Sequence, residues 1–208
     1  ALNRDQWDAL GVLRSDDNSQ FGRFNNYALS AGYKLNSQWR LVGSAGSSFQ
    51  APTFNQLYFP GFGNPELQPQ RSRSKELGVK YAAHALAASA VVYENRVQGF
   101  ITPSTNVQSA RATLRGATFA VDRQFETLLV KASYDYTDPR TEPDDKRIAR
   151  IARHVFNLNL SRETGPWQYY GELKLASDRI DRSGSREFNL GGYGLLNAGV
   201  GFKLYQDL

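Results

Sequence analysis

Residues 27–35 read Tyr27-Ala28-Leu29-Ser30-Ala31-Gly32-Tyr33-Lys34-Leu35 and alternate strictly. Their odd-numbered positions carry apolar or aromatic side chains, whereas their even-numbered positions carry small or polar ones. Successive side chains of a β-strand point to opposite faces, so a period of two residues is typical of a strand with one apolar and one polar face. The segment therefore predicts a strand whose two faces meet different surroundings.

The same period recurs along the chain, with Leu129 as an imperfect position. Together with turn signals from Gly, Pro, Asn, Asp and Ser, it predicts about ten strands. These strands cover residues 6–14, 25–35, 38–50, 73–82, 86–97, 109–121, 125–136, 149–161, 167–178 and 190–204.

The connections between these strands alternate between two lengths. The tight ones are residues 36–37, 83–85, 122–124 and 162–166, and the long ones are residues 15–24, 51–72, 98–108, 137–148 and 179–189. In an up-and-down barrel such an alternation puts all long loops at one rim, and outer-membrane barrels keep their longer loops outside. The sequence predicts an all-β, antiparallel, up-and-down transmembrane β-barrel with its long loops facing outwards.

Energetics assign the two faces of each strand. Most of the expected strands reach the length of about 9–11 residues that crosses the apolar core of a bilayer. A Lys or Arg on the lipid face near the middle of the bilayer costs about 2–4 kcal/mol. Lys131 and Asp135 should therefore point into the lumen, and Val130 and Tyr134 should face lipid. Aromatic side chains are also placed as in membrane girdles, with Trp39, Tyr81, Phe125 and Trp167 near tight turns and Tyr134, Tyr136 and Tyr193 toward long loops.

Composition narrows the classes of function. The chain has 208 residues, 40% of them hydrophobic, with no cysteine and only two histidines, His84 and His154. It lacks an apolar run of about 18 residues and an N-terminal signal peptide pattern. No cluster has metal-ligand spacing, so we expect no metal site, no cofactor and no catalytic residues, and His154 should hydrogen-bond at the start of a strand. The net charge of +5 is spread along the chain, so we expect no nucleic-acid partner.

The connection after the third expected strand, residues 51–69 (APTFNQLYFPGFGNPELQP), is rich in aromatic residues. Pro52 and Pro65 remove backbone donors and end regular structure, and Gly61 and Gly63 allow sharp turns. An aromatic cluster on an external loop is costly to expose without a partner. Two interpretations stay open: a ligand platform at the mouth of a barrel, or a loop that packs on itself over the barrel wall. The candidate ligand-binding residues are Phe54, Asn55, Tyr58, Phe59 and Phe62.

This loop also resembles a known family. The motifs that carry the resemblance are Ser47-Ser48-Phe49-Gln50-Ala51-Pro52, Asn55-Gln56-Leu57-Tyr58, Gly63-Asn64-Pro65-Glu66-Leu67-Gln68-Pro69, and then Ser72, Ser74 and Glu76. They resemble the C-terminal barrel half of TonB-dependent outer-membrane receptors, and most closely the cobalamin transporters among them. Residues 134–140, 147–154 and 191–204 are similar to later strands and loops of that family. Gln70 departs from the pattern, because the family usually carries a Glu there.

The resemblance implies a 22-stranded barrel that contains an N-terminal plug domain. Residues 1–208 would then be part of that barrel, with the plug domain and the final strands absent. The implied function is uptake of a scarce large nutrient, either cobalamin or, as an alternative, a ferric siderophore or haem. The implied partners are that nutrient, TonB through the missing plug, and outer-membrane lipid. The implied location is the outer membrane of a Gram-negative bacterium, and the chain is expected not to be an enzyme.

Two other classes remain as alternatives from the residues alone. One is an outer-membrane barrel enzyme such as a phospholipase, with Ser161 as its nucleophile. The other is a soluble β sandwich that binds carbohydrate. Acidic loop tips at Asp16-Asp17 and at Glu142, Asp144 and Asp145 offer carboxylates for calcium, although solvated charge is the favoured interpretation.

Overall fold

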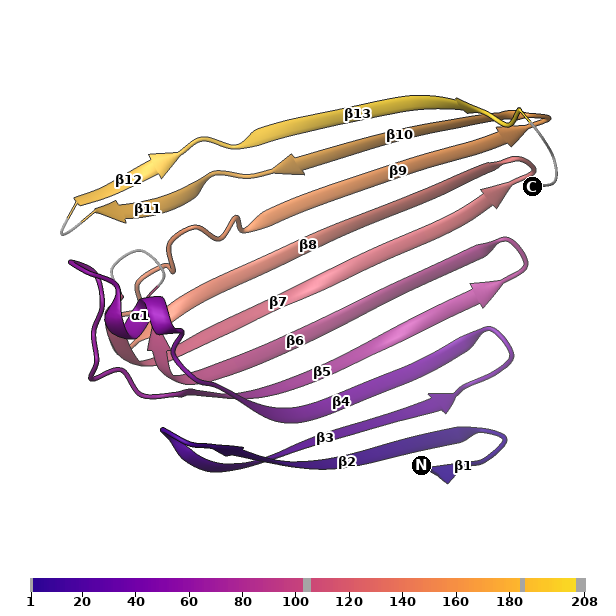
Figure 1. Ribbon diagram of the computed structural model, residues 1–208. Helices are drawn as coiled ribbons and strands as arrows, with labels where there is room; N and C mark the ends of the chain where they lie inside the picture. Colours follow the sequence, from indigo (N-terminus) through magenta and orange to yellow (C-terminus); the bar gives the residue numbers. More distant parts are fainter. Residues whose placement is uncertain (1, 103–105, 184–185, 205–208) are drawn as a thin grey trace.

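The computed structural model describes residues 2–102, 106–183 and 186–204, which form one large curved sheet (Figure 1). It contains a single short helix within these ranges. The elements are β1 (Leu2–Asn3), β2 (Trp7–Asn18), β3 (Gly22–Lys34), β4 (Trp39–Gln50), α1 (Phe54–Tyr58), β5 (Gln70–Ala83), β6 (Leu86–Ile101), β7 (Gln108–Phe125), β8 (Leu128–Glu142), β9 (His154–Thr164), β10 (Trp167–Ala176), β11 (Arg179–Ser183), β12 (Arg186–Leu190) and β13 (Tyr193–Phe202).

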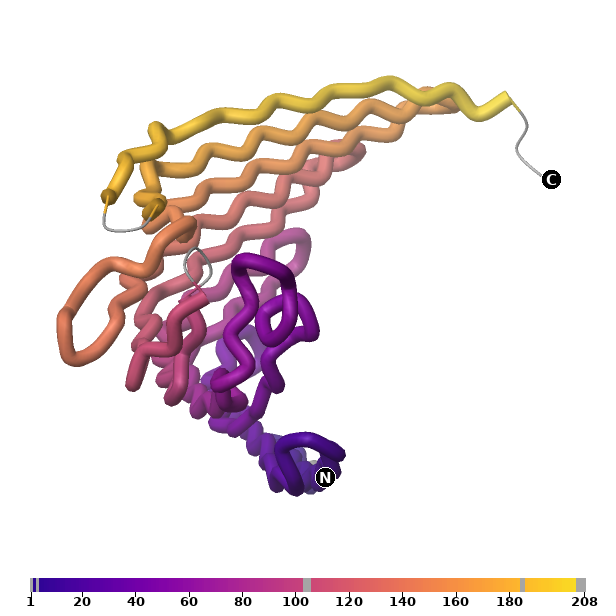
Figure 2. The backbone as a smooth tube through the Cα atoms, turned by 60° about the vertical axis from the view of Figure 1, so that its left-hand side comes forward, coloured from indigo at the N-terminus to yellow at the C-terminus, as the bar shows by residue number. Residues whose placement is uncertain are grey.

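The sheet has 11 strands in the order β1-β2-β3-β4-β5-β6-β7-β8-β9-β10-β13, and β11 pairs with β12 in a separate two-stranded sheet. All of these pairings are antiparallel. Each strand pairs with its neighbour in sequence, and β10 reaches β13 past the β11–β12 hairpin. The antiparallel up-and-down arrangement expected from the sequence is therefore confirmed. Figure 2 shows the sheet as an open arc, and its two edge strands do not pair with each other.

The ten long strands match the ten expected ones, but several continue beyond their predicted ends. The loop expected at 15–24 is mostly strand, because the Asn18 side chain accepts hydrogen bonds from the backbone of Gln20 and Phe21 and closes a tight turn before Gly22. The strand expected from residue 149 begins only at His154. Part of the loop expected at 179–189 is the β11–β12 hairpin, and residues 103–105 and 184–185 of the expected loops lie outside the described ranges.

The four turns that were predicted to be tight lie at the opposite end of the sheet from α1 (Figure 1). Three of them are close to their predicted positions, whereas the turn predicted at 122–124 occurs at 126–127. The prediction failed there because Asp122 and Arg123 keep their ladder partners on β8, and Glu126 takes the positive φ of 45° that closes the turn. Polar turn residues alone therefore placed this hairpin three residues too early.

One face of the sheet is polar, as the alternation predicts. Asp135 accepts a hydrogen bond from the Thr118 hydroxyl at 2.8 Å, and Asp8 pairs with Arg40 two strands away. Lys131 lies four residues before Asp135 on β8, and residues an even number apart on a strand share a face, so both side chains lie on this polar face. That assignment was the one predicted from the cost of burying charge in lipid.

The other face is apolar over the central part of each strand. Tyr134 stacks against Phe119 of β7 with 6.5 Å between ring centroids, and Val130 has the same alternation. Asp138 and Arg140 lie an even number of residues after Tyr134 on β8, so their side chains lie on the same face. Arg140 contacts Asp145, which belongs to the connection between β8 and β9. Figure 2 shows this connection on the convex side of the sheet. The apolar face is therefore the convex face, and the polar face is the concave one.

Aromatic side chains ring the convex face near the tight turns. Trp39 lies 4.8 Å from Tyr81 on the next strand, and Trp167 lies 4.8 Å from Phe202. The girdle predicted at this end is thus confirmed. The expectation that Tyr193 belongs to a membrane girdle is wrong. Tyr193 pairs with Ala176 on the concave face, where Arg179 lies over its ring.

Within the described residues, no helix is long and apolar enough to cross a membrane. In the part of the chain that the structure describes, no second sheet of comparable size packs on this sheet, and the buried apolar cluster is confined to the loop end. A sandwich must bury one face of each sheet against the other. The soluble β sandwich considered from the sequence is therefore wrong.

Candidate ligand-binding loop at the α1 end of the sheet

The 51–69 connection contains a short helix that its own sequence explains. Thr53 is the N-cap of α1: its hydroxyl accepts from the Gln56 backbone, and the Gln56 side chain accepts from the Thr53 backbone. This reciprocal capping box satisfies two donors that the start of a helix otherwise leaves free. Pro52 precedes the cap and is buried, so β4 cannot continue into the loop. The aromatic run of the sequence is therefore folded into one turn of helix and the coil after it.

The apolar side of this loop packs on the sheet. Leu57, Leu67 and Ile101 form a cluster in which each side chain is no more than 3% exposed, and Phe21 from the β2–β3 hairpin packs against it. Burial of such side chains is worth about 1.5–3 kcal/mol each relative to exposure. Leucines and an isoleucine, and not the aromatic residues, therefore hold the loop down.

Polar contacts tie the same loop to its neighbours. The Asn106 amide donates to the backbone oxygens of Gln56 (2.7 Å) and Phe62 (2.9 Å), and Asn106 is 3% exposed. Asn106 has a positive φ of 52°, a conformation that Asn tolerates better than most residues. The Gln108 amide donates to the Gln68 backbone oxygen at 2.8 Å, and its side-chain oxygen accepts from the Gln68 backbone nitrogen. These bonds connect the loop to the β6–β7 connection and to the start of β7.

The aromatic candidates point away from this packed side. Phe54 is 75% exposed, and its ring lies 5.1 Å from that of Tyr58, whose hydroxyl accepts from Gln20 at 3.2 Å. Phe59, at the C-cap of α1, and Phe62 are also exposed. Asn55 is exposed, and its backbone oxygen accepts from Phe59. The structure thus brings all five candidates onto one loop, which Figure 2 shows on the concave side of the sheet.

Of the two interpretations left open by the sequence, the loop that packs on itself is confirmed in part, whereas the ligand platform stays a prediction. The loop does pack on itself and on its neighbours, but through Leu57 and Leu67 instead of the aromatic rings. The rings remain outside as an exposed apolar surface above this packed cluster. Asn106 and Gln108, which provide the support, were not among the residues predicted for this site. Their signal was weak, since Asn106 is an isolated polar residue in an expected loop.

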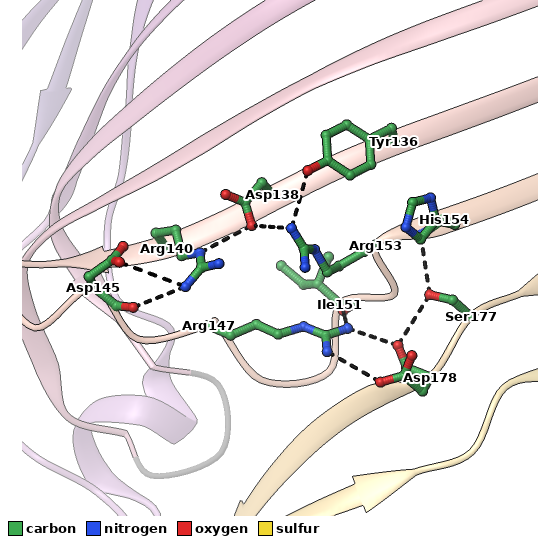
Figure 3. Close-up of polar contacts among 10 residues, drawn as sticks. All are labelled: Tyr136, Asp138, Arg140, Asp145, Arg147, Ile151, Arg153, His154, Ser177 and Asp178. Carbon is green, nitrogen blue, oxygen red and sulfur yellow. Dashed lines mark hydrogen bonds and ion pairs between the residues drawn. The ribbon is translucent and has the colours of Figure 1, made fainter.

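A second group of residues fastens the 143–153 connection (Figure 3). Arg153 donates to the Tyr136 hydroxyl (3.1 Å) and to Asp138 (3.0 Å), and Asp138 also accepts from Arg140. Arginine bonds to carboxylates are charge-assisted and geometrically specific. The network holds the connection against the end of β8, so that β9 starts later than its sequence pattern suggested.

The same connection also reaches across to the end of β10. Arg147 donates to the Asp178 backbone oxygen at 2.8 Å and pairs with its carboxylate at 3.3 Å. The backbone nitrogen of His154 donates to the Ser177 hydroxyl, and the His154 ring shares a 2.7 Å hydrogen bond with Tyr134 (Figure 3 shows the first). The prediction that His154 hydrogen-bonds at a strand start is confirmed.

The β11–β12 hairpin is anchored through Asp181. The Arg150 guanidinium donates to both carboxylate oxygens of Asp181 at 3.0 and 3.1 Å, and the Arg182 backbone nitrogen donates at 2.8 Å. These hydrogen bonds, that of Arg150 above all, hold the pKa of the Asp181 carboxyl below its usual value. The hairpin is therefore anchored by a carboxylate that stays ionised into acidic conditions.

The acidic residues considered for calcium do not converge on one another. Glu142 accepts from Arg111 and Thr113, Asp144 pairs with Lys146, and Asp145 lies 3.9 Å from Arg140. Within the described ranges, no three His, Cys, Asp or Glu residues are grouped closely enough to hold a metal ion. These carboxylates serve as partners for arginine and lysine in the loops.

The second acidic tip behaves in the same way. Asp16 accepts from Arg14 at 2.7 Å, and Asp17 pairs with Arg23 at 3.4 Å. Ser161, the nucleophile of the enzyme alternative, has the opposite alternation from His154 along β9 and lies near the other end of that strand. A base on the other face of the strand cannot take its proton, so His154 does not form a catalytic pair with Ser161.

These features define a segment of transmembrane β-barrel wall with a supported aromatic loop at one rim. Residues 2–208 match the family model described as TonB dependent receptor-like, beta-barrel. The chain belongs to this family of TonB-dependent receptors, whose members are outer-membrane β-barrel proteins of Gram-negative bacteria.

Curated relatives and solved structures agree on the fold. The vitamin B12 transporter BtuB of Vibrio vulnificus (strain YJ016) is 29% identical over 213 residues, covering 96% of this chain and 33% of the transporter. A ferric enterobactin receptor (PfeA) variant from Pseudomonas aeruginosa superposes with a TM-score of 0.80 at 16% identity, over 98% of this chain and 36% of the receptor. The copper transporter OprC gives 0.79 at 17% identity, over 98% and 38%. The chain spans about one third of the length of the curated relatives it matches.

Proposed function

We propose that this chain is part of the barrel wall of an outer-membrane uptake receptor whose loop 51–69 contacts a large nutrient, with cobalamin as that nutrient. The observation that carries the proposal is the outward display of Phe54, Tyr58, Phe59 and Phe62 on a loop anchored from beneath. Exposed aromatic surface on a rigid support is typical of a recognition surface, because binding then orders little that was mobile. Cobalamin is favoured by the two BtuB relatives at 29% identity.

The same proposal includes the rest of the receptor. The polar concave face, with groups such as Lys131, Asp135 and the Asp8–Arg40 pair, suits the wall of a lumen that holds a plug domain. The chain would then contribute about a third of the whole, and TonB would act through that plug, which these residues do not include. The convex apolar face would lie against lipid in the outer membrane of a Gram-negative bacterium.

Binding by the full-length gene product tests the loop. Replacing both Phe54 and Phe59 by Ser leaves Leu57 and its cluster in place, so the loop should keep its fold. Truncation of an aromatic contact residue costs about 1–2 kcal/mol, so each ring should account for about a 5- to 30-fold loss of cyanocobalamin affinity by titration calorimetry. Phe125→Ser is the matched control, because Phe125 is also an exposed aromatic residue but lies at the end of β7 that is far from the 51–69 loop. Unchanged affinity in the double variant contradicts the proposal.

A second variant tests the support of the loop instead of its surface. Asn106→Gly tolerates the positive φ and removes both donors to the Gln56 and Phe62 backbone. The Phe62 backbone oxygen then loses its partner, at a cost of about 1–3 kcal/mol, whereas the Gln56 backbone oxygen still accepts from the Asn64 backbone nitrogen. We expect faster hydrogen exchange in residues 54–62 and weaker cyanocobalamin binding, while the thermal midpoint of the whole barrel changes little. Unaltered exchange in those residues would show that Asn106 does not support the loop.

The identity of the nutrient is tested by titrating the full-length gene product with cyanocobalamin and, separately, with ferric enterobactin. The siderophore is the relevant competitor because PfeA structures share the fold at a TM-score of 0.80. Binding of cyanocobalamin alone supports the proposed nutrient. Binding of the ferric siderophore alone, with loss in the Phe54 and Phe59 variant, keeps the receptor and rejects cobalamin.

A further inference from the structure

The convex face carries a group of arginines just beyond its apolar band. Arg23, Arg71, Arg73, Arg96 and Arg111 line one groove, with a volume of about 520 Å³, formed by β3 to β7 near their α1 ends. On β5, β6 and β7 these arginines follow the alternation of the apolar convex residues farther down each strand. The groove is therefore on the outer wall of the barrel and not in its lumen.

Among residues 2–102, 106–183 and 186–204, fewer carboxylates than arginines lie at this groove. Arg23, Arg96 and Arg111 each pair with one carboxylate, namely Asp17, Glu94 and Glu142. Arg71 and Arg73 have no carboxylate within 4 Å among the described residues, and Arg71 lies over the Phe24 ring at 5.2 Å.

Two of these arginines lie directly opposite each other on neighbouring strands. Arg73 and Arg96 are direct partners in the β5–β6 ladder, and like charges directly opposite each other destabilise a sheet. An anion between the two guanidinium groups would turn this repulsion into attraction. Guanidinium groups bind phosphate with two parallel hydrogen bonds, which makes phosphate the anion that this arrangement fits best.

A hollow of small apolar residues continues the groove along the same face. It has a volume of about 480 Å³, and its lining includes Ala9, Gly11, Leu29, Ala31, Gly43 and Ala45. On β4, Ala45 of the hollow is two residues from Ser47 of the arginine groove, so both side chains lie on the convex face. Small side chains here leave a channel where larger ones would fill the surface. A basic recess and an apolar one thus lie next to each other on the same face.

We infer that these two neighbouring recesses together bind a phosphate-bearing lipid of the outer leaflet. Its phosphate contacts Arg71, Arg73 and Arg96, and an acyl chain lies in the hollow beside Gly43 and Ala45. This inference goes beyond nutrient uptake, and it rests on the proposed function only for the location of the barrel in the outer membrane. A soluble phosphate would use the arginines alone, whereas a lipid uses both recesses.

The test measures lipid retained by the full-length gene product in detergent, by native mass spectrometry. The probes are diphosphoryl lipid A, the same lipid without phosphates, and inorganic phosphate. Arg71→Gln with Arg73→Gln should reduce binding of the diphosphoryl lipid at least tenfold. Lys80→Gln with Lys131→Gln is the matched control: it removes the same charge from the concave face and should leave binding unchanged.

A variant in the hollow separates lipid from free anion. Ala45→Phe fills the channel without touching an arginine, so it should weaken the lipid and spare inorganic phosphate. Equal retention of the dephosphorylated lipid, an equal loss in the Lys80 and Lys131 control, or phosphate binding as tight as that of the lipid would each overturn the inference. Cyanocobalamin affinity should be unchanged in the arginine variant, so the two proposals fail independently.

Discussion

Leu158 is the position where the assignment of the two faces can be tested most sharply. It lies on the convex face of β9, between Ala132 of β8 and Leu173 of β10. The polar ends of this face of β9, His154 and Arg162, are each about 13 Å away along the strand, or about 9 Å in depth at a tilt of about 45°. An arginine at Leu158 could therefore reach the polar boundary only in part.

The expected cost follows from that depth. Leu158→Arg should destabilise the barrel by about 2–4 kcal/mol, which lowers the ratio of folded to unfolded protein by about 30-fold to 900-fold. The matched control is the next residue, Asn159→Arg, whose side chain lies on the concave face between Lys131 and Glu172. Opposite charges flank that position, so its change should stay within about 0.5 kcal/mol.

The assay is equilibrium unfolding in urea of the full-length gene product folded into phospholipid vesicles, followed by tryptophan fluorescence. Both variants carry the same new side chain in the same strand, so strand propensity cancels and only the face differs. If Asn159→Arg proves as costly as Leu158→Arg, or more so, the convex face does not meet lipid. The assignment of the concave face to the lumen would then be wrong as well.

Two further predictions concern packing and pH. A Cβ at Gly116 would lie 2.1 Å from a backbone oxygen of β8 and 2.5 Å from the Tyr93 hydroxyl, so Gly116→Ala should lower stability in the same urea titration by about 1–3 kcal/mol. Gly171→Ala, with open space around it, should change stability by less than about 0.5 kcal/mol, and equal effects would contradict the packing. Folding lowers the pKa of Asp181, so the bond between Asp181 and Arg150 stabilises the β11–β12 hairpin fully at a pH above the usual aspartate pKa. This stabilisation is lost as the pH falls through the lowered pKa of the folded state. Hydrogen exchange of the hairpin, corrected for intrinsic pH effects, should therefore rise only at strongly acidic pH, and Asp181→Asn should remove that dependence; a hairpin that loosens between pH 7 and pH 5 would contradict it.

The candidate site shows where sequence reasoning reaches its limit. The exposed rings of Phe54 and Phe59 were identified because an aromatic loop flanked by strands is unusual in composition. Asn106 was not, because its role depends on the loop lying over the β6–β7 connection, and nothing in an isolated Asn signals a partner 44 or 50 residues away. Likewise, the late start of β9 follows from the contacts of Arg153 with β8 and of Arg147 with Asp178, which lies between β10 and β11.

The ten long strands, their order and their two faces were determined by the residues alone, because a two-residue period is a local property of the backbone and a misplaced charge in lipid is too costly to tolerate. Lys131 and Tyr134 lie on the faces that this argument assigned. The tertiary structure decided which loop residues meet, since contacts such as Asn106 with Phe62 and Arg73 with Arg96 depend on the register and curvature of many strands together. The register between two strands is set by the pairing of all their residues together, so it cannot be predicted from any single segment of the sequence.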